Sequence, residues 1–282
     1  MNIQWYPGHM TKAKRAMQDD VKAVDLIIEI VDARAPLSTR NPDIENLGRG
    51  KGRMIVMNKA DLADEVMSEA WIRWFEKQGF TCFLMDARSR KNLKLLLKKI
   101  EQACAEKRER DRKRGILNRP VRAMVAGIPN VGKSTLINTI AGRSTAKTGN
   151  RPGVTRGNQW IRLNKSVELL DTPGILWPKF EDPQVGERIA FLGSVSDLIT
   201  VPEELASELV RTLRSLGAEK GLEERFGLPE GASPEEILET VAKARGCLGP
   251  GGTPDTEKAA GILMNEFRAG TLGRITLEEA PE

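Results

Sequence analysis

The sequence contains few cysteines, and they follow no recognisable spacing. Cys82, Cys104 and Cys247 are scattered through 282 residues without a C-x-x-C pair. This odd, dispersed set indicates neither a disulfide framework nor a zinc site. We therefore expect reduced thiols, as in a cytoplasmic protein.

Long apolar runs are also missing. The apolar run at 26–31 is interrupted by Glu29 and is far too short to cross a bilayer. The first residues lack the basic and apolar regions of a signal peptide, and we find no internal repeat or low-complexity segment. These absences argue against a membrane protein, and we expect a cytoplasmic monomer.

The composition is that of an ordinary globular protein. Hydrophobic residues make up 40% and charged residues 29% of the chain, and this length suits two domains. Lys and Arg number 44 against 39 Asp and Glu, a net charge of +5. That excess would suit a polyanionic partner if it gathers on one face.

Strand and helix patterns alternate in the first part of the chain only. Apolar, strand-like runs are predicted at 25–31, 53–57, 80–85, 121–126, 160–163 and 166–170. Helical spacing separates several of them, which predicts an α/β fold with a mainly parallel sheet and helices on both faces over residues 1–178. Helical patterns at 185–193, 203–216, 234–245 and 255–269 then predict an all-helical C-terminal domain over 179–282. The charged run 107–114 is interpreted as a solvated helix end, or alternatively as a contact with nucleic acid.

Residues 127–135 read Gly-Ile-Pro-Asn-Val-Gly-Lys-Ser-Thr and fit the phosphate-binding pattern G-x-x-x-x-G-K-[ST]. They follow a predicted strand and precede helical spacing, which is the context this pattern requires. Gly127 and Gly132 would let successive N–H groups point at phosphate, next to the positive end of a helix. Lys133 would reach the β- and γ-phosphates and Ser134 would hold Mg²⁺. The stretch predicts a nucleoside triphosphate site.

Two further motifs specify the nucleotide. Asp171, in Asp-Thr-Pro-Gly, is expected to hold a Mg²⁺ water, with the Gly174 N–H near the γ-phosphate. Asn58 is expected to tie the base motif to the phosphate loop, and the Lys59 stem to lie along the base plane. The Asp61 carboxylate would accept hydrogen bonds from guanine N1–H and N2–H₂. Adenine offers no such donors, so a wrong base would leave a buried carboxylate unpaired. These motifs each end a predicted strand, where open α/β sheets bind ligands, and together they indicate GTP.

The motifs stand in an unusual order. The base-specifying motif comes first, then Asp86-Ala87-Arg88, where the Ala87 N–H would meet guanine O6. The phosphate loop is third, followed by Thr155 and then Asp171. The same sheet is retained if the helix and linker at 92–118 join the original termini, which is the definition of a circular permutation.

At this point the sequence resembles the circularly permuted GTPases of the YlqF type. The resemblance runs nearly end to end, through the opening Trp-Tyr-Pro-Gly-His-Met at 5–10, Asp-Ala-Arg-Ala-Pro at 32–36, the permuted motifs, and the closing stretch 255–278. Asp86-Ala87-Arg88-Ser89 departs from the usual Ser/Asn-Ala form. The resemblance implies a GTPase that acts late in large-subunit assembly, binds ribosomal RNA and is stimulated by the ribosomal particle. It also implies that the helical domain contributes to this binding.

No residue in the nucleotide motifs is suited to orient the attacking water. Ile175 occupies the position where many GTPases place a glutamine, so a polar group must come from elsewhere. His9 is the single histidine, and the resemblance implicates it in hydrolysis, although a lone histidine is usually structural. Thr11 is expected to cap the helix that follows it. Asn130 either helps hold K⁺ beside the phosphates or simply favours the turn.

The predicted site can be stated by role. The predicted catalytic residues are His9, Lys133 and Thr155. The predicted Mg²⁺ ligands are Ser134, Thr155 and Asp171. The predicted GTP-binding residues are Asn58, Lys59, Asp61, Asp86, Ala87, Arg88, Asn130, Val131, Gly132, Lys133, Ser134, Thr135, Asp171 and Gly174.

Two other functions stay open at this point. An RNA-binding assembly scaffold could use GTP only as a conformational ligand, although the intact phosphate and magnesium motifs argue against a dead site. A signalling or transport GTPase is disfavoured by the basic charge and by the lack of lipidation motifs. Arg268 and Arg274 in the last stretch could contact RNA phosphate or lie on a solvated surface.

Overall fold

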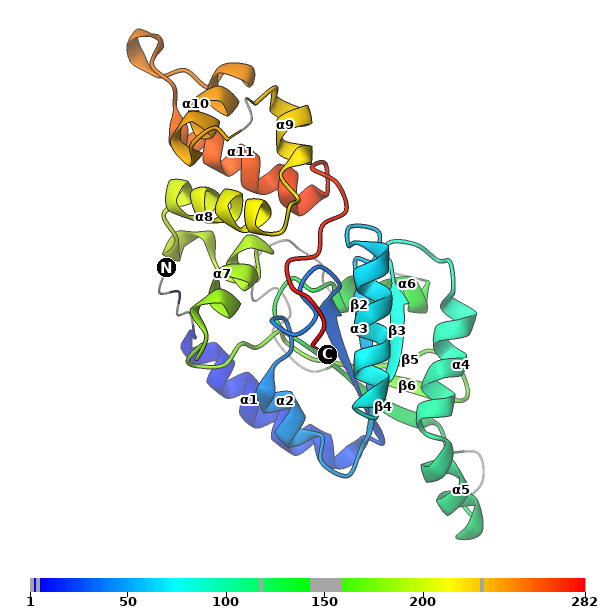
Figure 1. Ribbon diagram of the computed structural model, residues 1–282. Helices are drawn as coiled ribbons and strands as arrows, with labels where there is room; N and C mark the ends of the chain where they lie inside the picture. Colours follow the sequence, from blue (N-terminus) through cyan, green and yellow to red (C-terminus); the bar gives the residue numbers. More distant parts are fainter. Residues whose placement is uncertain (1–2, 4–5, 117–118, 143–158, 229–230, 282) are drawn as a thin grey trace.

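A six-stranded sheet forms the centre of the first half of the molecule in the computed structural model, which describes residues 3, 6–116, 119–142, 159–228 and 231–281 (Figure 1). The strands lie in the order β3-β2-β1-β4-β6-β5. They are β1 (Leu26–Asp32), β2 (Gly52–Asn58), β3 (Thr81–Met85), β4 (Val121–Ala126), β5 (Gln159–Arg162) and β6 (Val167–Asp171). All neighbouring pairs are parallel except β5 with β6. The predicted strands and α/β fold are confirmed.

Alternating side chains of the strands pack under helices on both faces of the sheet. The helices of this part are α1 (Gly8–Asp20), α2 (Pro42–Leu47), α3 (Glu65–Lys77), α4 (Leu93–Ala103), α5 (Ala105–Lys113) and α6 (Lys133–Ala141), with a 3₁₀ turn at Val21–Ala23. Ile55 belongs to the buried cluster that includes Trp71 of α3, whereas its neighbour Val56 belongs to the cluster that includes Leu96 of α4. Because side chains of a strand alternate between faces, this separation shows that α3 and α4 cover opposite faces.

The strand register brings the predicted motifs to one edge of the sheet. Asp32 lies beside Asn58, and Asn58 beside Met85, at the carboxyl ends of β1, β2 and β3. On the other side of β1, Val125 near the end of β4 lies beside Asp171 at the end of β6. Parallel strands therefore deliver the base motifs, the phosphate loop and Asp171 to the same edge.

The second part of the chain is helical among its described residues. It contains α7 (Pro183–Phe191), α8 (Pro202–Ser215), α9 (Lys220–Phe226), α10 (Pro234–Ala244) and α11 (Thr256–Ala269), with 3₁₀ turns at Asp197–Ile199 and Pro250–Gly252. The four predicted helices are present, and the short α9 is an addition. Helices α8 to α11 stack at one end of the sheet domain (Figure 1).

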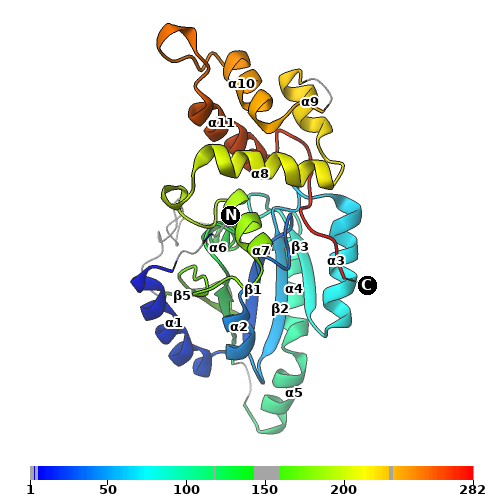
Figure 2. The same ribbon diagram turned by 60° about the vertical axis from the view of Figure 1, so that its left-hand side comes forward.

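The chain after α11 returns to the sheet domain and ends beside α3 (Figure 2). The Ile275 N–H donates to the Leu62 carbonyl at 3.0 Å, and the Trp71 indole N–H donates to the Glu278 carbonyl at 3.1 Å. One apolar cluster also continues from the sheet domain into α7 and α8. The boundary at 178/179 stays a prediction, and these contacts show that the two parts share core and backbone hydrogen bonds.

The start of α1 differs from the predicted cap. The helix begins at Gly8 with Pro7 in the N-cap position and no side-chain cap, so Thr11 lies inside it. The proline ring fixes φ near the helical value and needs no donor at this position. The prediction that Thr11 caps this helix was wrong, and His9 consequently sits in the first helical turn.

The three cysteines are buried, and burial raises the pKa of Cys82 and of Cys104 to about 12. Both thiols are therefore protonated and unreactive at neutral pH. Among the helices of the described residues, none combines the length and apolar character needed to cross a membrane.

Candidate nucleotide-binding site

The phosphate loop joins β4 to α6, and two of its glycines leave no room for a Cβ. Gly127 has φ +149°, and a Cβ added there would lie 2.4 Å from the Ile30 carbonyl oxygen. Gly132 has φ +97° at the N-cap of α6, and its Cβ would lie 2.2 Å from Nδ2 of Asn58. Any side chain at either position would push the loop away from β1 and from the base motif. Glycine is therefore needed at these positions for lack of space as well as for the predicted loop conformation.

Lys133 opens α6 and lies across the loop rather than out in solvent. The side chain is buried, and its Nζ donates to the Ile128 carbonyl at 2.7 Å. Burial lowers the pKa of Lys133 to about 8, an effect that the nearby Asp171 carboxylate partly opposes. A phosphate brought to this Nζ would favour its charged form.

Asp171 ends β6 and supplies an unsatisfied acceptor to the site. Its Oδ1 is buried with no hydrogen-bond partner among the described residues. Burial raises the pKa of Asp171 to about 6, with Lys133 acting in the opposite direction. A buried carboxylate oxygen without a donor fits a hard cation or its bound water. The donor set at this edge thus suits Mg²⁺.

Gly174 lies directly against the phosphate loop. A Cβ at this residue would lie 2.8 Å from Lys133 Nζ and 2.8 Å from the Pro129 backbone. The following residue, Ile175, donates its N–H to the Gly127 carbonyl at 3.4 Å and is fully buried. The Asp-Thr-Pro-Gly segment is therefore in van der Waals contact with the loop, where it would sense a terminal phosphate.

Asn58 connects the base motif to both neighbouring motifs. Its Nδ2 donates to the Val131 carbonyl at 2.7 Å, and its Oδ1 accepts the Ala87 N–H at 2.8 Å. The contact with the phosphate loop is the one that we predicted. The contact with Ala87 was not predicted. We expected the Ala87 N–H to donate to guanine O6, and here it donates to Asn58. Asn58 thus holds three motifs from distant parts of the chain in one fixed arrangement.

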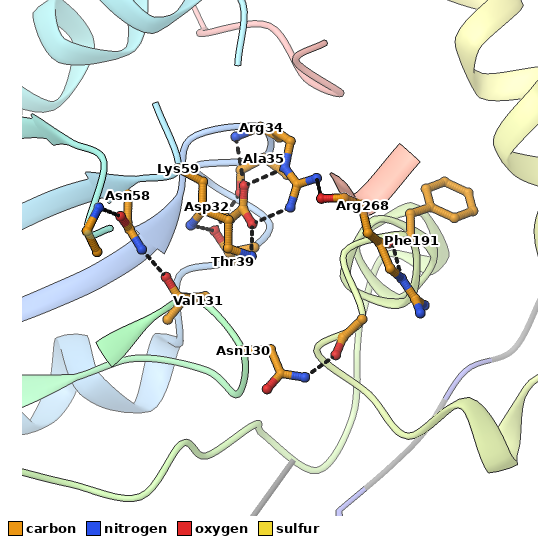
Figure 3. Close-up of polar contacts among 12 residues, drawn as sticks. Asp32, Arg34, Ala35, Thr39, Asn58, Lys59, Asn130, Val131, Phe191 and Arg268 are labelled. Atoms are coloured by element: carbon orange, nitrogen blue, oxygen red, sulfur yellow. Dashed lines mark hydrogen bonds and ion pairs between the residues drawn. The ribbon is translucent and has the colours of Figure 1, made fainter. Parts of the chain in front are cut away.

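Lys59 is anchored by a buried ion cluster that the sequence did not reveal. Figure 3 shows Asp32 held between Lys59 and Arg34, with Lys59 Nζ 2.8 Å from Asp32 Oδ2. Arg34 makes a two-point contact with Asp32, Nε to Oδ1 and Nη2 to Oδ2, each at 2.9 Å. Burial by itself would raise the pKa of Asp32, but the two cations outweigh it and hold that pKa well below its usual range. The cluster fixes the Lys59 stem, which is predicted to lie along the base.

Asp61, the predicted guanine acceptor, is paired with an arginine. The Arg88 guanidinium bonds the Asp61 carboxylate and lies 3.5 Å from Asp86 Oδ1, while the Arg88 N–H donates to the same Asp86 oxygen at 2.9 Å. Arg88 is 67% exposed, and an exposed pair contributes at most about 1 kcal/mol. Guanine could therefore displace the arginine at little cost.

The remaining predicted residues are placed as follows. Ser134 and Thr135 lie in the first turn of α6, directly after Lys133. His9 is exposed in the first turn of α1, while its neighbour Met10 is buried and its sulfur accepts the Leu176 N–H at 3.5 Å. The start of α1 is therefore attached to the segment that follows Gly174. Thr155 lies outside the described residues.

Asn130 connects the phosphate loop to the helical part, and Arg268 of α11 connects the end of α7 to Arg34 in the sheet domain (Figure 3). Asn130 has φ +61°, and its Nδ2 donates to the Gly193 carbonyl just after α7 at 2.6 Å. Arg268 donates to the Phe191 and Ala190 carbonyls, each at 2.9 Å, at the end of that helix. The Arg268 carbonyl in turn accepts from Arg34 Nη1 at 3.3 Å. Arg268 is therefore an internal linking residue.

Arg274 is exposed but also contacts the sheet domain. Its guanidinium donates to the Ala63 carbonyl at 2.7 Å and to the Ala60 carbonyl at 3.2 Å, next to the base motif. Arg274 therefore lies on the surface, as one of the two alternatives stated, and it also holds the last stretch of the chain against the base motif.

The titration of the two buried groups predicts how GTP binding depends on pH. With Mg²⁺ present, binding should be tightest between about pH 6 and pH 8. Below this range the nucleotide-free protein carries a proton on Asp171 that must leave, and above it Lys133 has already lost the proton that phosphate needs. Calorimetric titrations from pH 5 to 9 should show affinity falling on both sides, by up to about tenfold per pH unit. In Asp171→Asn the acidic limb should vanish, and a wild-type affinity constant across this range would contradict the prediction.

The sheet, the phosphate loop and the order of the motifs define a circularly permuted P-loop GTPase. A sequence model described as "50S ribosome-binding GTPase" matches residues 122–222. The chain belongs to the ribosome biogenesis GTPase A family, also called YlqF. It is 44% identical to ribosome biogenesis GTPase A of Bacillus cereus, over 100% of this chain and 95% of that protein.

Solved structures of the same family support the fold. A GDP-bound YlqF superposes with a TM-score of 0.68 at 28% identity, over 93% of this chain and 98% of that one. A GNP-bound YlqF from Thermotoga maritima gives 0.67 at 28% identity, over 96% and 99%. The chain is therefore a GTPase of the ribosome biogenesis class, and the predicted resemblance is confirmed.

Proposed function

We propose that this GTPase acts in late maturation of the large ribosomal subunit in the cytoplasm and binds ribosomal RNA in a nucleotide-dependent way. The proposal rests on one observation above all. Asn58 ends β2, Asp171 ends β6 and Lys133 opens α6 just after the phosphate loop, and the three lie at one edge of the sheet, as hydrolysis of GTP requires. The relatives named for ribosome biogenesis supply the biological setting.

Each part of the site has a role in this proposal. Asp61 reads guanine, and Lys133 with the loop N–H groups binds the phosphates. Ser134, Asp171 and Thr155 would hold Mg²⁺, which when bound neutralises charge that develops on the phosphates. The unpartnered Oδ1 of Asp171 supports this assignment.

His9 is the proposed group for orienting or deprotonating the attacking water. Ile175 is buried and apolar, so it cannot do this. His9 lies in the turn whose Met10 is bonded to Leu176, one residue beyond Ile175. A movement of α1 over the nucleotide, made when the particle binds, would carry His9 toward the phosphate.

The nucleotide dependence is proposed to pass through the contact of Asn130 with Gly193. This 2.6 Å bond ties the phosphate loop to the end of α7. Rearrangement of the loop around a terminal phosphate would strain or release it and thereby move the helical part. Because the Asn130 amide nitrogen is engaged here, potassium binding at Asn130 stays a separate hypothesis.

The function is tested by GTP turnover with and without large ribosomal subunits. Wild-type turnover should rise with subunits, whereas His9→Ala should lose about 10²–10⁴-fold of the stimulated rate with GTP affinity kept. Thr11→Ala, an exposed neighbour in α1, is the matched control and should behave as wild type. Unchanged stimulated turnover in His9→Ala would remove His9 from the mechanism.

The same samples separate the GTPase from a scaffold that uses GTP only as a conformational ligand. A scaffold would pellet with subunits but show no stimulation of turnover. Pelleting should also be stronger with a non-hydrolysable GTP analogue than with GDP. Equal pelleting in both nucleotides would remove the switch from the proposal.

A further inference from the structure

The charge of the chain is divided unevenly between its two parts. Residues 179–282 contain eleven Lys and Arg against twenty Asp and Glu, a net charge of −9. Since the whole chain carries +5, residues 1–178 carry +14. RNA is a polyanion, so the surface that attracts it should lie on the first part.

A cavity in the helical domain is lined mainly by acidic side chains. This cavity, of about 430 Å³, is open between α8 and α10. Its lining includes five carboxylates, Glu203, Glu204, Glu208, Glu235 and Glu239, and one arginine, Arg211. Arg211 is already paired with Glu208 at 2.8 Å. This surface would repel phosphate.

The positive charge is concentrated in α4, α5 and the residues just before them. Residues 88–114 contain twelve Lys and Arg against four Asp and Glu, a net charge of +8. This single stretch exceeds the net charge of the whole protein. It begins at Arg88 of the Asp86-Ala87-Arg88 motif and ends just beyond α5, which projects from the sheet domain at the end remote from α8 to α11 (Figures 1 and 2).

Most of these cations are not neutralised by neighbours. Within the described part of the chain, seven of the twelve form no ion pair, namely Arg90, Lys91, Lys94, Lys98, Lys99, Arg110 and Arg114. By contrast, nine of the eleven cations of the helical domain are paired. Unpaired charge attracts phosphate without first breaking an internal contact.

The unpaired cations lie at exposed positions, except for Lys99, which is half-buried. In α4, Leu96 and Ile100 are buried against the sheet, while Lys94 and Lys98 are exposed one turn apart. Helix α5 has no apolar face, and only Asp111 of its residues is buried. A solvated helix end would explain exposure alone, but not seven unpaired cations within 25 residues, four of them in α4 and α5 and three in the segments next to them.

We infer that the exposed side of α4 and α5 binds the phosphate backbone of RNA. This inference rests on the proposed function and locates its RNA contact on the GTPase domain. Because α4 begins at Leu93, with only four residues between it and Asp86-Ala87-Arg88, a short segment links the helix that would touch RNA to the predicted guanine site. The contact is with phosphates, so it positions the protein on RNA without reading the base sequence.

The inference is tested with two charge-reversal triples of equal net charge. Lys94→Glu, Lys98→Glu and Arg110→Glu are combined in one variant, and Lys220→Glu, Lys243→Glu and Lys258→Glu in the control, all at exposed positions. Binding to a transcript of 23S ribosomal RNA is measured by filter retention over a series of KCl concentrations. The first triple should bind at least about tenfold more weakly at low salt. Its slope of log K against log salt should be shallower by about 2–3, one unit for each lost phosphate contact. The control should stay within about twofold of wild type.

Three outcomes would overturn the inference. Equal weakening of both triples would show an effect of net charge alone, and wild-type protein that does not bind the transcript would remove RNA as the partner. Loss of binding to poly-L-glutamate in the first triple, with RNA binding kept, would assign the surface to an acidic protein. Melting curves and GTP turnover without RNA should match wild type in both triples, which separates loss of RNA contact from misfolding. Turnover stimulated by subunits tests the proposed function independently.

Discussion

Lys133→Ala should reduce GTP turnover by about 10²–10³-fold and leave the fold intact. The side chain is buried across the phosphate loop, and its Nζ is held by the Ile128 carbonyl 2.7 Å away. A fixed positive charge beside the transferring phosphate stabilises the transition state, and removal of one such donor typically has an effect of this size. Turnover is measured with saturating GTP and large subunits.

The same substitution should abolish stabilisation by nucleotide. For wild-type protein, GTP at a hundred times its dissociation constant should add about 2.7 kcal/mol to the free energy of unfolding. Lys133→Ala should show almost no shift of the melting temperature on adding GTP. Lys165→Ala, an exposed lysine in the turn between β5 and β6, serves as the control and should keep both properties. Turnover within tenfold of wild type would place the phosphate site elsewhere.

Much of the site could be predicted because its signals are local. The phosphate loop needs glycines, a lysine and a hydroxyl within nine residues, and the strand before it is apolar apart from Arg122. The base motif and Asp171 likewise follow apolar runs directly. Once each motif is known to end a parallel strand, the sheet places them together whatever their order in the chain. Circular permutation therefore did not hide the site.

The parts that could not be predicted depend on contacts between distant residues. In the sequence, Asp32 and Arg34 lie in what reads as an ordinary loop. Only the fold shows that both are buried and that they make a two-point contact. The return of the C-terminus, with Glu278 accepting the Ser38 N–H at 3.0 Å, has no periodic signal at all. The short helices α2 and α9 span too few residues for a helical pattern to emerge. In each case the information lies in tertiary packing.

Arg34→Met should destabilise the folded protein, because it removes one member of the buried ion cluster. Arg34 is 2% exposed. Its guanidinium contacts both Asp32 of the buried ion cluster and the Arg268 carbonyl at the end of α11. Removing one partner of a buried pair leaves an uncompensated charge, which costs roughly 3–5 kcal/mol. Because Lys59 still lies 2.8 Å from Asp32, we expect the lower part of that range. For a chain of this size the melting temperature should fall by roughly 6–12 °C.

A loss of stability alone would not show that the cluster serves the nucleotide, so GTP affinity is measured on the same variant at a temperature where it is folded. Asp32 holds Lys59 in place, and without the Arg34 guanidinium the carboxylate keeps only Lys59 and the main-chain N–H of residue 34, so Lys59 is held less firmly. GTP affinity should therefore fall as well, whereas Arg211→Met, which breaks an exposed pair on α8, should change stability by less than about 1 kcal/mol and leave GTP binding alone. Arg34→Lys should recover little, because an ammonium group cannot make the two-point contact that the guanidinium makes with Asp32. If Arg34→Met melts as wild type does, the cluster is not a support of the fold. If it melts lower but binds GTP normally, Lys59 is held by the base motif itself and the link from α11 to the guanine site is structural only.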